Sequence, residues 1–157
     1  MASTTVQRLQ DAFPDQVTVP GATAYDPQVQ APWSQACWQP AAAYVQLASV
    51  ADVSRALAIV TQTQSPFAVR STGHNPNPGF SSVGESGVVL DIRPLQSKSL
   101  DEDGTARCGA GCTWGEVYSW LEEQKRSAIG GRDPNVGLAG FLLGGECPRR
   151  CTPSSPG

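Results

Sequence analysis

The feature that most constrains the fold is a strand–helix–strand pattern between residues 42 and 70. The sequence AAYVQL over residues 42–47 predicts a short strand. Ser49 and Asp52 then form a capping-box pattern that predicts the start of a helix over residues 49–64. Its apolar face is formed by Val53, Ala56, Leu57 and Val60. Pro66 disfavours helical geometry just before it, so PFAVR over residues 66–70 is expected to be the next strand.

Further elements are expected on both sides of this unit. Val6, Leu9 and Phe13 predict a helix over residues 3–13. Downstream, VVLDI predicts a strand over residues 88–92, and the DEDG turn is followed by a predicted strand over residues 105–110. A second capping box, Thr113 with Glu116, starts a helix expected to run to residue 125. The pattern predicts an α+β fold, with helices packed on small mixed sheets.

The chain divides into three expected regions. Residues 1–38 are predicted to be an N-terminal helix followed by a Pro-broken segment that wraps the surface as a long loop. Residues 39–146 carry the strand and helix patterns and form the expected domain. Residues 147–157, CPRRCTPSSPG, show no hydrophobic periodicity and are expected to be a disordered tail.

The charge and hydropathy patterns disfavour two classes of partner. The chain has 157 residues, with 11 Lys and Arg against 14 Asp and Glu, a net charge of −3. It carries no basic block, so we expect no nucleic-acid partner. Its apolar runs are too short to span a bilayer, so we expect no membrane partner. The N-terminus lacks the features of a signal peptide, which favours a cytoplasmic location with reduced thiols.

The only histidine lies in the sequence RSTGHNPNPGF, directly after a predicted strand. Backbone amides, the hydroxyls of Ser71 and Thr72 and the cation of Arg70 could together cradle a phosphate there. The prolines that follow would hold His74 in a fixed place. However, a lone histidine without a local partner is more often a solvated turn residue, and the residues alone favour that interpretation.

A second glycine-rich segment, GGRDPNVGLAGFLLGGE, covers residues 130–146. Its glycines are not explained by helix formation, so we expect tight turns or a close approach of the backbone to something else. The segment does not match the dinucleotide fingerprint GxGxxG, and Gly144 could instead serve helix-to-strand packing. No phosphate-loop pattern GxxxxGK[ST] occurs in the chain.

The cysteines allow a zinc-bound interaction module as a weaker alternative. Cys108 with Cys112, and Cys147 with Cys151, could form two ligand pairs. Four steps along a strand would separate the first two side chains by about 13 Å, which is too far for one zinc ion unless the chain turns between them. We therefore expect Cys108 and Cys112 to be small buried apolar residues and no metal site.

Taken in order, five segments resemble a known family. They are QPAAAYVQLASVADVSRALAIV, PFAVRSTGHNPNPGFSS, VVLDIRPL, GAGCTWGEVY and GGRDPNVGLAGFLLGGE. Together they are similar to the FAD-binding, PCMH-type domain of the vanillyl-alcohol oxidase family. The resemblance is strongest to the berberine-bridge-enzyme-like FAD-linked oxidases of fungi.

The resemblance implies FAD as cofactor and gives roles to both loops. It implies that Arg70, Ser71, Thr72 and Gly73 wrap the FAD pyrophosphate and that His74 is the candidate for covalent attachment of the flavin. It also implies that backbone at Gly137, Gly140, Gly144 and Gly145 lies against the cofactor. The implied reaction is oxidation of a small organic substrate, with hydride transfer to the flavin and reoxidation by dioxygen.

The chain departs from the family pattern at three places. Thr72 stands where the first of two paired glycines is usual, and Asp133 stands where some members carry a second, cysteine attachment, so we expect no bicovalent link. Glu146 stands where a third glycine is usual. Family members continue with the rest of the FAD domain and with a substrate domain that holds the catalytic base, and we expect neither within these 157 residues. We therefore expect a partial FAD-binding domain with no catalytic residue of its own, and the alternative is a truncated, non-catalytic remnant.

Overall fold

A four-stranded mixed sheet forms the centre of the fold. The computed structural model describes residues 2–145 of the chain. The sheet has the order β1-β2-β4-β3, in which β2, β4 and β3 are parallel and β1 is antiparallel to β2. The strand bounds are β1 Val17–Thr18, β2 Ala43–Gln46, β3 Phe67–Arg70 and β4 Val88–Asp91. Because the three parallel strands share one direction, their carboxyl ends meet at one edge of the sheet, where the predicted loop after Arg70 begins.

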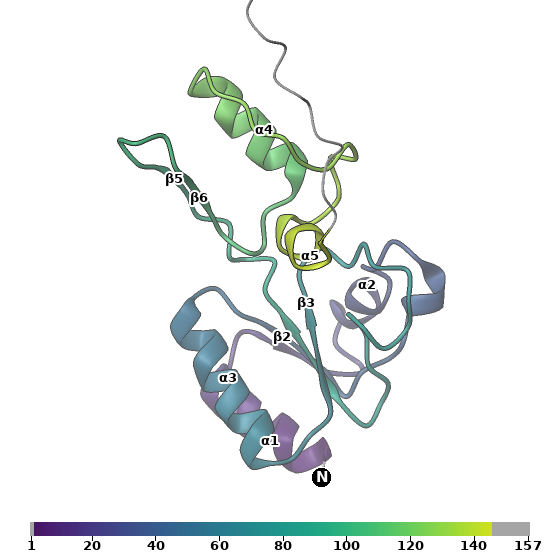
Figure 1. Cartoon of the computed structure of the whole chain (residues 1–157). Helices are drawn as coiled ribbons and strands as arrows, with labels where there is room; N and C mark the ends of the chain where they lie inside the picture. The colour runs from purple at the N-terminus through teal and green to yellow at the C-terminus, as the bar shows by residue number, and fades with distance from the viewer. Residues whose placement is uncertain (1, 146–157) are drawn as a thin grey trace, which may run out of the picture.

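Helices α1 (Ala2–Ala12) and α3 (Val50–Gln62) cover one face of this sheet (Figure 1). Their buried side chains pack with those of β2 and β4 in one cluster: Leu9, Phe13, Ala43, Val45, Leu47, Ala56, Ile59, Val60, Val88 and Leu90. The Ser49 hydroxyl accepts a hydrogen bond from the Asp52 amide (3.0 Å), which confirms the predicted start of α3. The N-terminal helix therefore shares a core with the later strands, while the proposed boundary at residue 38 stays a prediction.

The opposite face of the sheet is covered by α2 (Tyr25–Val29), which belongs to the segment expected to be a long loop. That expectation is wrong in part, because the segment also contains β1 and the short helix η1 (Gln35–Cys37). Tyr25 packs edge-to-face on Tyr44 of β2, and its hydroxyl donates a hydrogen bond to the Ala41 carbonyl (2.7 Å). These elements are short and depend on contacts with the sheet, so local sequence patterns do not reveal them.

A hairpin and a helix lie beyond one end of the sheet strands (Figure 1). Strands β5 (Lys98–Leu100) and β6 (Ala106–Cys108) pair antiparallel, and α4 (Trp114–Glu123) follows. The strand expected over residues 105–110 is confirmed as β6, whereas β5 lacks the apolar alternation that would predict it. Thr113 and Glu116 form the complete capping box expected at the start of α4.

The second glycine-rich segment contains a helix that was not expected. Residues Leu138–Leu143 form α5, with Gly137 and Gly144 at its two caps and Gly140 inside it. Leu138 packs against the cluster of Cys112, Val117 and Leu121, and the Phe141 ring lies edge-on to Trp114 at 5.3 Å. These apolar contacts hold a six-residue helix that contains Gly140.

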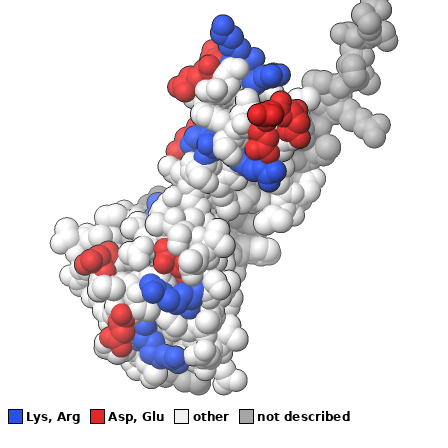
Figure 2. Space-filling model, turned by 90° about the vertical axis from the view of Figure 1, so that its left-hand side faces the viewer, with Lys and Arg blue, Asp and Glu red and all other residues white. Residues whose placement is uncertain are grey.

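The predicted α+β class, with helices on small mixed sheets, is confirmed. Within the part of the chain that is described, no helix is long and apolar enough to span a membrane. Figure 2 shows acidic and basic side chains interspersed on one face of the molecule. Glu146 and the predicted tail lie outside the described residues.

Candidate functional site

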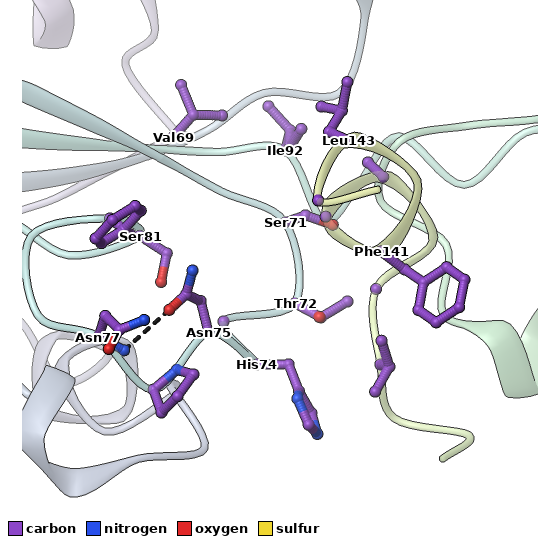
Figure 3. Close-up of a pocket in the computed structure, with 18 residues that line it drawn as sticks. Val69, Ser71, Thr72, His74, Asn75, Asn77, Ser81, Ile92, Phe141 and Leu143 are labelled. Atoms are coloured by element: carbon purple, nitrogen blue, oxygen red, sulfur yellow. Dashed lines mark hydrogen bonds between the residues drawn. The ribbon is translucent and has the colours of Figure 1, made fainter. Parts of the chain in front are cut away.

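The two loops singled out in the sequence face each other across one pocket of about 610 Å³ (Figure 3). The first loop leaves β3 at the carboxyl edge of the sheet, and the second contains α5. Seven of the predicted site residues line this pocket: Ser71, Thr72, Gly73, His74, Gly137, Gly140 and Gly144. Segments far apart in the sequence therefore build one site.

Contacts on both sides of the first loop fix its path. The Ser71 hydroxyl donates a hydrogen bond to the Ala110 carbonyl (2.7 Å), which ties the start of the loop to the segment before α4. Gly73 has a φ of +73°, and a Cβ on it would lie 3.1 Å from the Cα of Pro32. The second glycine of the usual pair is therefore needed here for its backbone conformation and for the close approach of residue 32.

The second loop is fixed by the residues that begin α4. Thr113 and Gly137 form an isolated antiparallel bridge, and the Leu138 amide donates a hydrogen bond to the Cys112 carbonyl (2.9 Å). A Cβ on Gly137 would lie 2.6 Å from the Thr72 hydroxyl oxygen, so a side chain at this position would collide with the first loop. A Cβ on Gly140 would meet no atom within 4 Å, which leaves the pocket wall open there.

The pocket wall combines apolar and polar groups. Val69, Ile92, Phe141 and Leu143 supply apolar surface, and Leu143 is 89% exposed. The opposite part carries the side chains of Asn75, Asn77 and Ser81, with the Asn77 amide donating to the Asn75 side chain (2.9 Å). Among the described residues, the buried Ser81 hydroxyl has no hydrogen-bond partner. Such a wall suits a ligand that has both a flat apolar part and a polar part.

His74 is held between two residues from other segments. The Trp33 indole stacks on its ring, with centroids 5.5 Å apart and an interplanar angle of 16°. On the edge of the ring, His74 Nε2 lies 3.6 Å from Asp133 Oδ2. The Asn135 amide donates a hydrogen bond to Asp133 (2.8 Å), and this bond, followed by the nearby His74, lowers the pKa of the Asp133 carboxyl. His74 is thus not a freely solvated turn residue.

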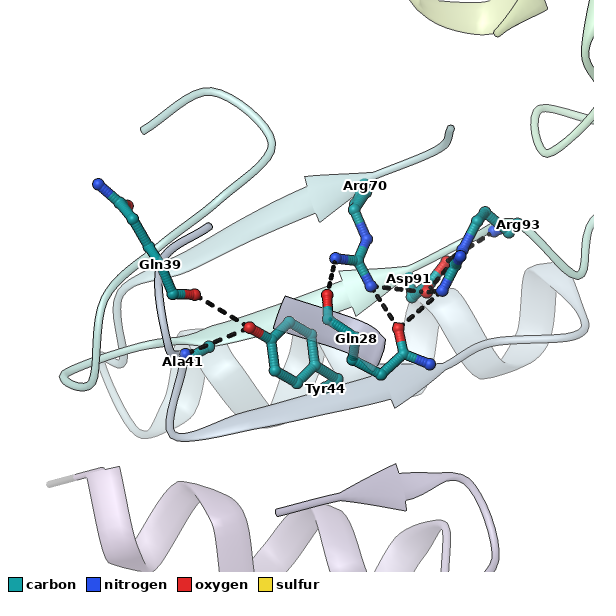
Figure 4. A network of polar contacts seen from close by, with 7 residues as sticks. All are labelled: Gln28, Gln39, Ala41, Tyr44, Arg70, Asp91 and Arg93. Atoms are coloured by element: carbon teal, nitrogen blue, oxygen red, sulfur yellow. Dashed lines mark hydrogen bonds and ion pairs between the residues drawn. The ribbon is translucent and has the colours of Figure 1, made fainter. Parts of the chain in front are cut away.

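Two predicted residues do not reach the pocket, Arg70 and Gly145. Arg70 is only 1% exposed and lies in a buried polar network (Figure 4). Its guanidinium donates to the Gln28 carbonyl (2.7 Å) and forms an ion pair with Asp91 (3.1 Å). Burial lowers the pKa of the Arg70 guanidinium, and the charge of Asp91 counteracts this effect. Arg70 thus joins β3 to α2 and β4, where the sequence suggested a direct contact with pyrophosphate.

Sequence reasoning missed several residues of the site. Trp33 carries no local signal of a site, but its amide donates to the Gly73 carbonyl (3.1 Å) and its indole stacks on His74. In the sequence, Asp133 is distinguished only by its departure from the family pattern. Phe141 and Ser81 carry no local signal that would assign them to a pocket.

The cysteines do not form a metal site in the described part of the chain. Cys108 and Cys112 are free thiols, and across residues 2–145 no three metal-ligating side chains converge. Cys112 is buried as expected, whereas Cys108 is only partly buried, and burial raises the pKa of both thiols. Cys147 and Cys151 lie outside the described residues.

Comparisons with known sequences all match the chain to FAD-binding proteins. A family model described as an FAD binding domain matches residues 41–155. The FAD-dependent monooxygenase macF of Penicillium terrestre is 42% identical over 121 residues, covering 76% of this chain and 23% of the relative. The FAD-dependent monooxygenase yanF of Aspergillus niger is 37% identical over 122 residues, which cover 77% of this chain and 21% of the relative. The chain thus spans about a quarter of the length of these curated relatives.

Solved structures share the same fold. The berberine-bridge-enzyme-like protein 1 of Physcomitrella patens superposes with a TM-score of 0.77 at 24% identity, over 88% of this chain and 30% of that one. The 6-hydroxy-D-nicotine oxidase of Arthrobacter nicotinovorans gives a TM-score of 0.72 at 28% identity, over 80% of this chain and 27% of the oxidase chain. The expected PCMH-type architecture, present here in part, is therefore confirmed.

Proposed function

Because the chain belongs to the FAD binding domain family, we propose that the pocket between its two loops is part of an FAD site. The observation that supports this most directly is the meeting of seven predicted residues in one pocket. Gly140 leaves open space on one wall, and the unpartnered Ser81 hydroxyl offers a polar contact on another. These features fit a large cofactor with an apolar ring system and a polar chain.

The residues divide by chemistry within this proposal. The Thr72 hydroxyl and the backbone amides of the first loop are suited to the pyrophosphate, whereas the Ser71 hydroxyl already donates to the Ala110 carbonyl. Phe141 and Leu143 provide the apolar surface suited to the flavin ring, and the bare backbone at Gly140 lets the cofactor approach. Arg70 does not contact the cofactor in this proposal. It fixes the end of β3, where the first loop begins, through its contacts with Gln28 and Asp91.

His74 is the proposed residue for covalent attachment. An imidazole nitrogen of His74 would form a bond to the 8α-carbon of the flavin, with loss of one N–H and one C–H bond. The two electrons and two protons released in this bond formation would pass to dioxygen, which would leave as hydrogen peroxide. The fixed placement of the His74 ring by Trp33 and Asp133 supports this assignment, because attachment requires a well-oriented nucleophile.

The activity of the whole protein is a further proposal. Bound FAD would supply a two-electron acceptor, able to take a hydride from a small organic substrate and pass the electrons to dioxygen. The similarity to macF and yanF, which are FAD-dependent monooxygenases, supports flavin-dependent chemistry. This chain spans about a quarter of those relatives, so we assign it cofactor binding and no substrate base.

A titration of the purified chain with FAD tests the binding proposal. The flavin fluorescence is expected to change saturably as FAD enters the pocket, and the emission of the nearby Trp33 and Trp114 gives a second signal. Riboflavin, which lacks the pyrophosphate, is expected to bind more weakly. A flavin signal that never saturates would contradict the proposal.

A further inference from the structure

We infer that Trp33 and Asp133 are positioning residues that together fix the His74 imidazole, with Trp33 setting the ring plane and Asp133 setting which nitrogen carries the proton. The inference rests on the proposed role of His74 in flavin attachment. Three separate segments supply these residues: the turn before η1, the first loop and the segment that precedes α5. Their convergence on one ring is the observation that carries the inference.

Trp33 is placed by its own backbone. Its amide donates a hydrogen bond to the Gly73 carbonyl (3.1 Å), which is directly next to His74. The Trp38 indole donates to the Pro32 carbonyl (2.9 Å) and so fixes the preceding residue. Trp33 is 68% exposed, and an aromatic side chain this exposed gains little from burial. Its contact with the imidazole at 5.5 Å and 16° is the interaction that defines its orientation.

Asp133 is placed just as specifically. One of its carboxylate oxygens accepts the Asn135 amide, so the other, Oδ2, is left facing His74 Nε2 at 3.6 Å. This distance is within ion-pair range and longer than an ordinary hydrogen bond. The carboxyl is ionised at neutral pH, and its pKa is lowered further, first by the Asn135 amide and then by His74. A fixed negative charge therefore lies on the Nε2 side of the ring.

This charge distinguishes the two nitrogens of a neutral imidazole. A proton on Nε2 faces the carboxylate, whereas a lone pair on Nε2 would be repelled by it. Asp133 thus favours the tautomer with the proton on Nε2 and the lone pair on Nδ1. The nitrogen available for bond formation is then Nδ1, while stacking on Trp33 limits rotation of the ring plane. An uncharged side chain at residue 133 would remove this bias.

Nuclear magnetic resonance tests the inference without any flavin, because the chain has a single histidine. The ¹⁵N shifts of its ring report the tautomer ratio at a pH where the ring is neutral. Asp133→Asn is expected to shift the ratio away from the Nε2–H form by up to about fivefold, the factor that corresponds to an exposed ion pair. Asp103→Asn is the matched control, since Asp103 also accepts a backbone amide two residues on, from Thr105, in the β5–β6 turn.

The same spectra test Trp33 through the ring current that its indole exerts on the imidazole protons. Trp33→Ala is expected to remove the upfield shift of these protons, and Trp33→Phe, which can still stack, is expected to retain part of it. A tautomer ratio that is unchanged in Asp133→Asn, or equally changed in Asp103→Asn, would overturn the role of Asp133. Imidazole proton shifts that are identical in Trp33→Ala and the parent chain would overturn the role of Trp33.

A flavin arm separates this inference from the proposed function. At saturating FAD, covalent incorporation is expected to slow by up to about fivefold in Asp133→Asn and to be unchanged in Asp103→Asn. Equal rates in parent and Asp133→Asn would contradict a positioning role in attachment. If the parent chain incorporates no flavin, the proposed function fails, while the tautomer and ring-current measurements still decide how the ring is held.

Discussion

Gly137 approaches Thr72 so closely that a methyl group on Gly137 would lie 2.6 Å from the Thr72 hydroxyl oxygen. The same methyl group would lie 3.2 Å from the Ser71 hydroxyl oxygen. The two loops of the pocket are therefore in contact through a position that has no room for a side chain. The contact also explains why Thr72 can replace a glycine in the first loop, because space for its side chain is provided by Gly137.

Gly137→Ala is expected to push the two loops apart and weaken FAD binding. Overpacking of this kind also lowers the free energy of unfolding by about 1–3 kcal/mol. Fluorescence titration with FAD and urea unfolding measure the two effects. Gly84→Ala is the matched control, since a Cβ there meets no atom within 4 Å and the φ of Gly84 is not positive. Equal FAD affinities in the two variants would contradict the close approach of the loops.

Arg70→Met is expected to lower the free energy of unfolding by about 3 kcal/mol, because it leaves the buried Asp91 carboxylate with less compensating charge. Urea unfolding measures the change. Arg107→Met is the control: the ion pair of Arg107 with Asp101 is exposed, and its loss should cost less than about 1 kcal/mol. If both variants lose the same stability, Arg70 does not have the structural role assigned to it.

Thr113→Ala is expected to destabilise the start of α4 by about 1 kcal/mol, because the Thr113 hydroxyl accepts the Glu116 amide (3.2 Å). Thr113 also pairs with Gly137, so the second loop should lose protection as well. Hydrogen exchange of the α4 and α5 amides measures both effects. Faster exchange confined to α4 would show that the cap does not support the pocket.

Much of the fold follows from local signals in the sequence. Ser49, Thr113 and Pro66 mark helix ends through short-range geometry, and the apolar runs of β2 and β4 mark buried strands. The fold of residues 15–39 could not be predicted, because α2 depends on the Tyr25 contact with Tyr44 and on the bonds of Gln28 to Arg70. Such contacts join residues that are distant in the sequence.

The site was predicted where backbone geometry carries the signal and missed where side chains from other segments complete it. Gly73 has a positive φ, and Gly137 lies too close to Thr72 for a side chain. Both requirements select glycine, so the sequence itself points to these two positions. Trp33 and Asp133 belong to the site only because the fold brings them to His74. Arg70 looked like a pocket residue by position alone, but in a strand the side chain of each successive residue points to the opposite face.

The three tyrosines are expected to ionise only above their ordinary pKa of 10.0 in the folded chain. Burial is the main cause that raises the pKa of Tyr25, Tyr44 and Tyr118. Because the folded pKa exceeds the unfolded one, this contribution to stability is fully present below pH 10 and is lost as the pH rises through the folded pKa.

Absorbance of tyrosinate measured against pH checks this prediction. The native chain should titrate at higher pH than the chain in denaturant, and unfolding should become easier in the alkaline range. Superimposable native and denatured titration curves would show that the tyrosine hydroxyls are not buried in the folded chain. For Tyr44 they would also contradict the hydrogen bond from its hydroxyl to the Gln39 carbonyl (3.0 Å).

The flavin absorbance of the purified chain, loaded with FAD and then precipitated with acid, tests the central claim most directly. The parent chain is expected to keep yellow flavin in the precipitate, because His74 would hold it through a covalent bond. His74→Ala is expected to bind FAD in solution but to release all of it into the acid supernatant. A parent chain that takes up no FAD before precipitation would contradict the account. Flavin retained equally by the parent and His74→Ala would contradict the role of His74.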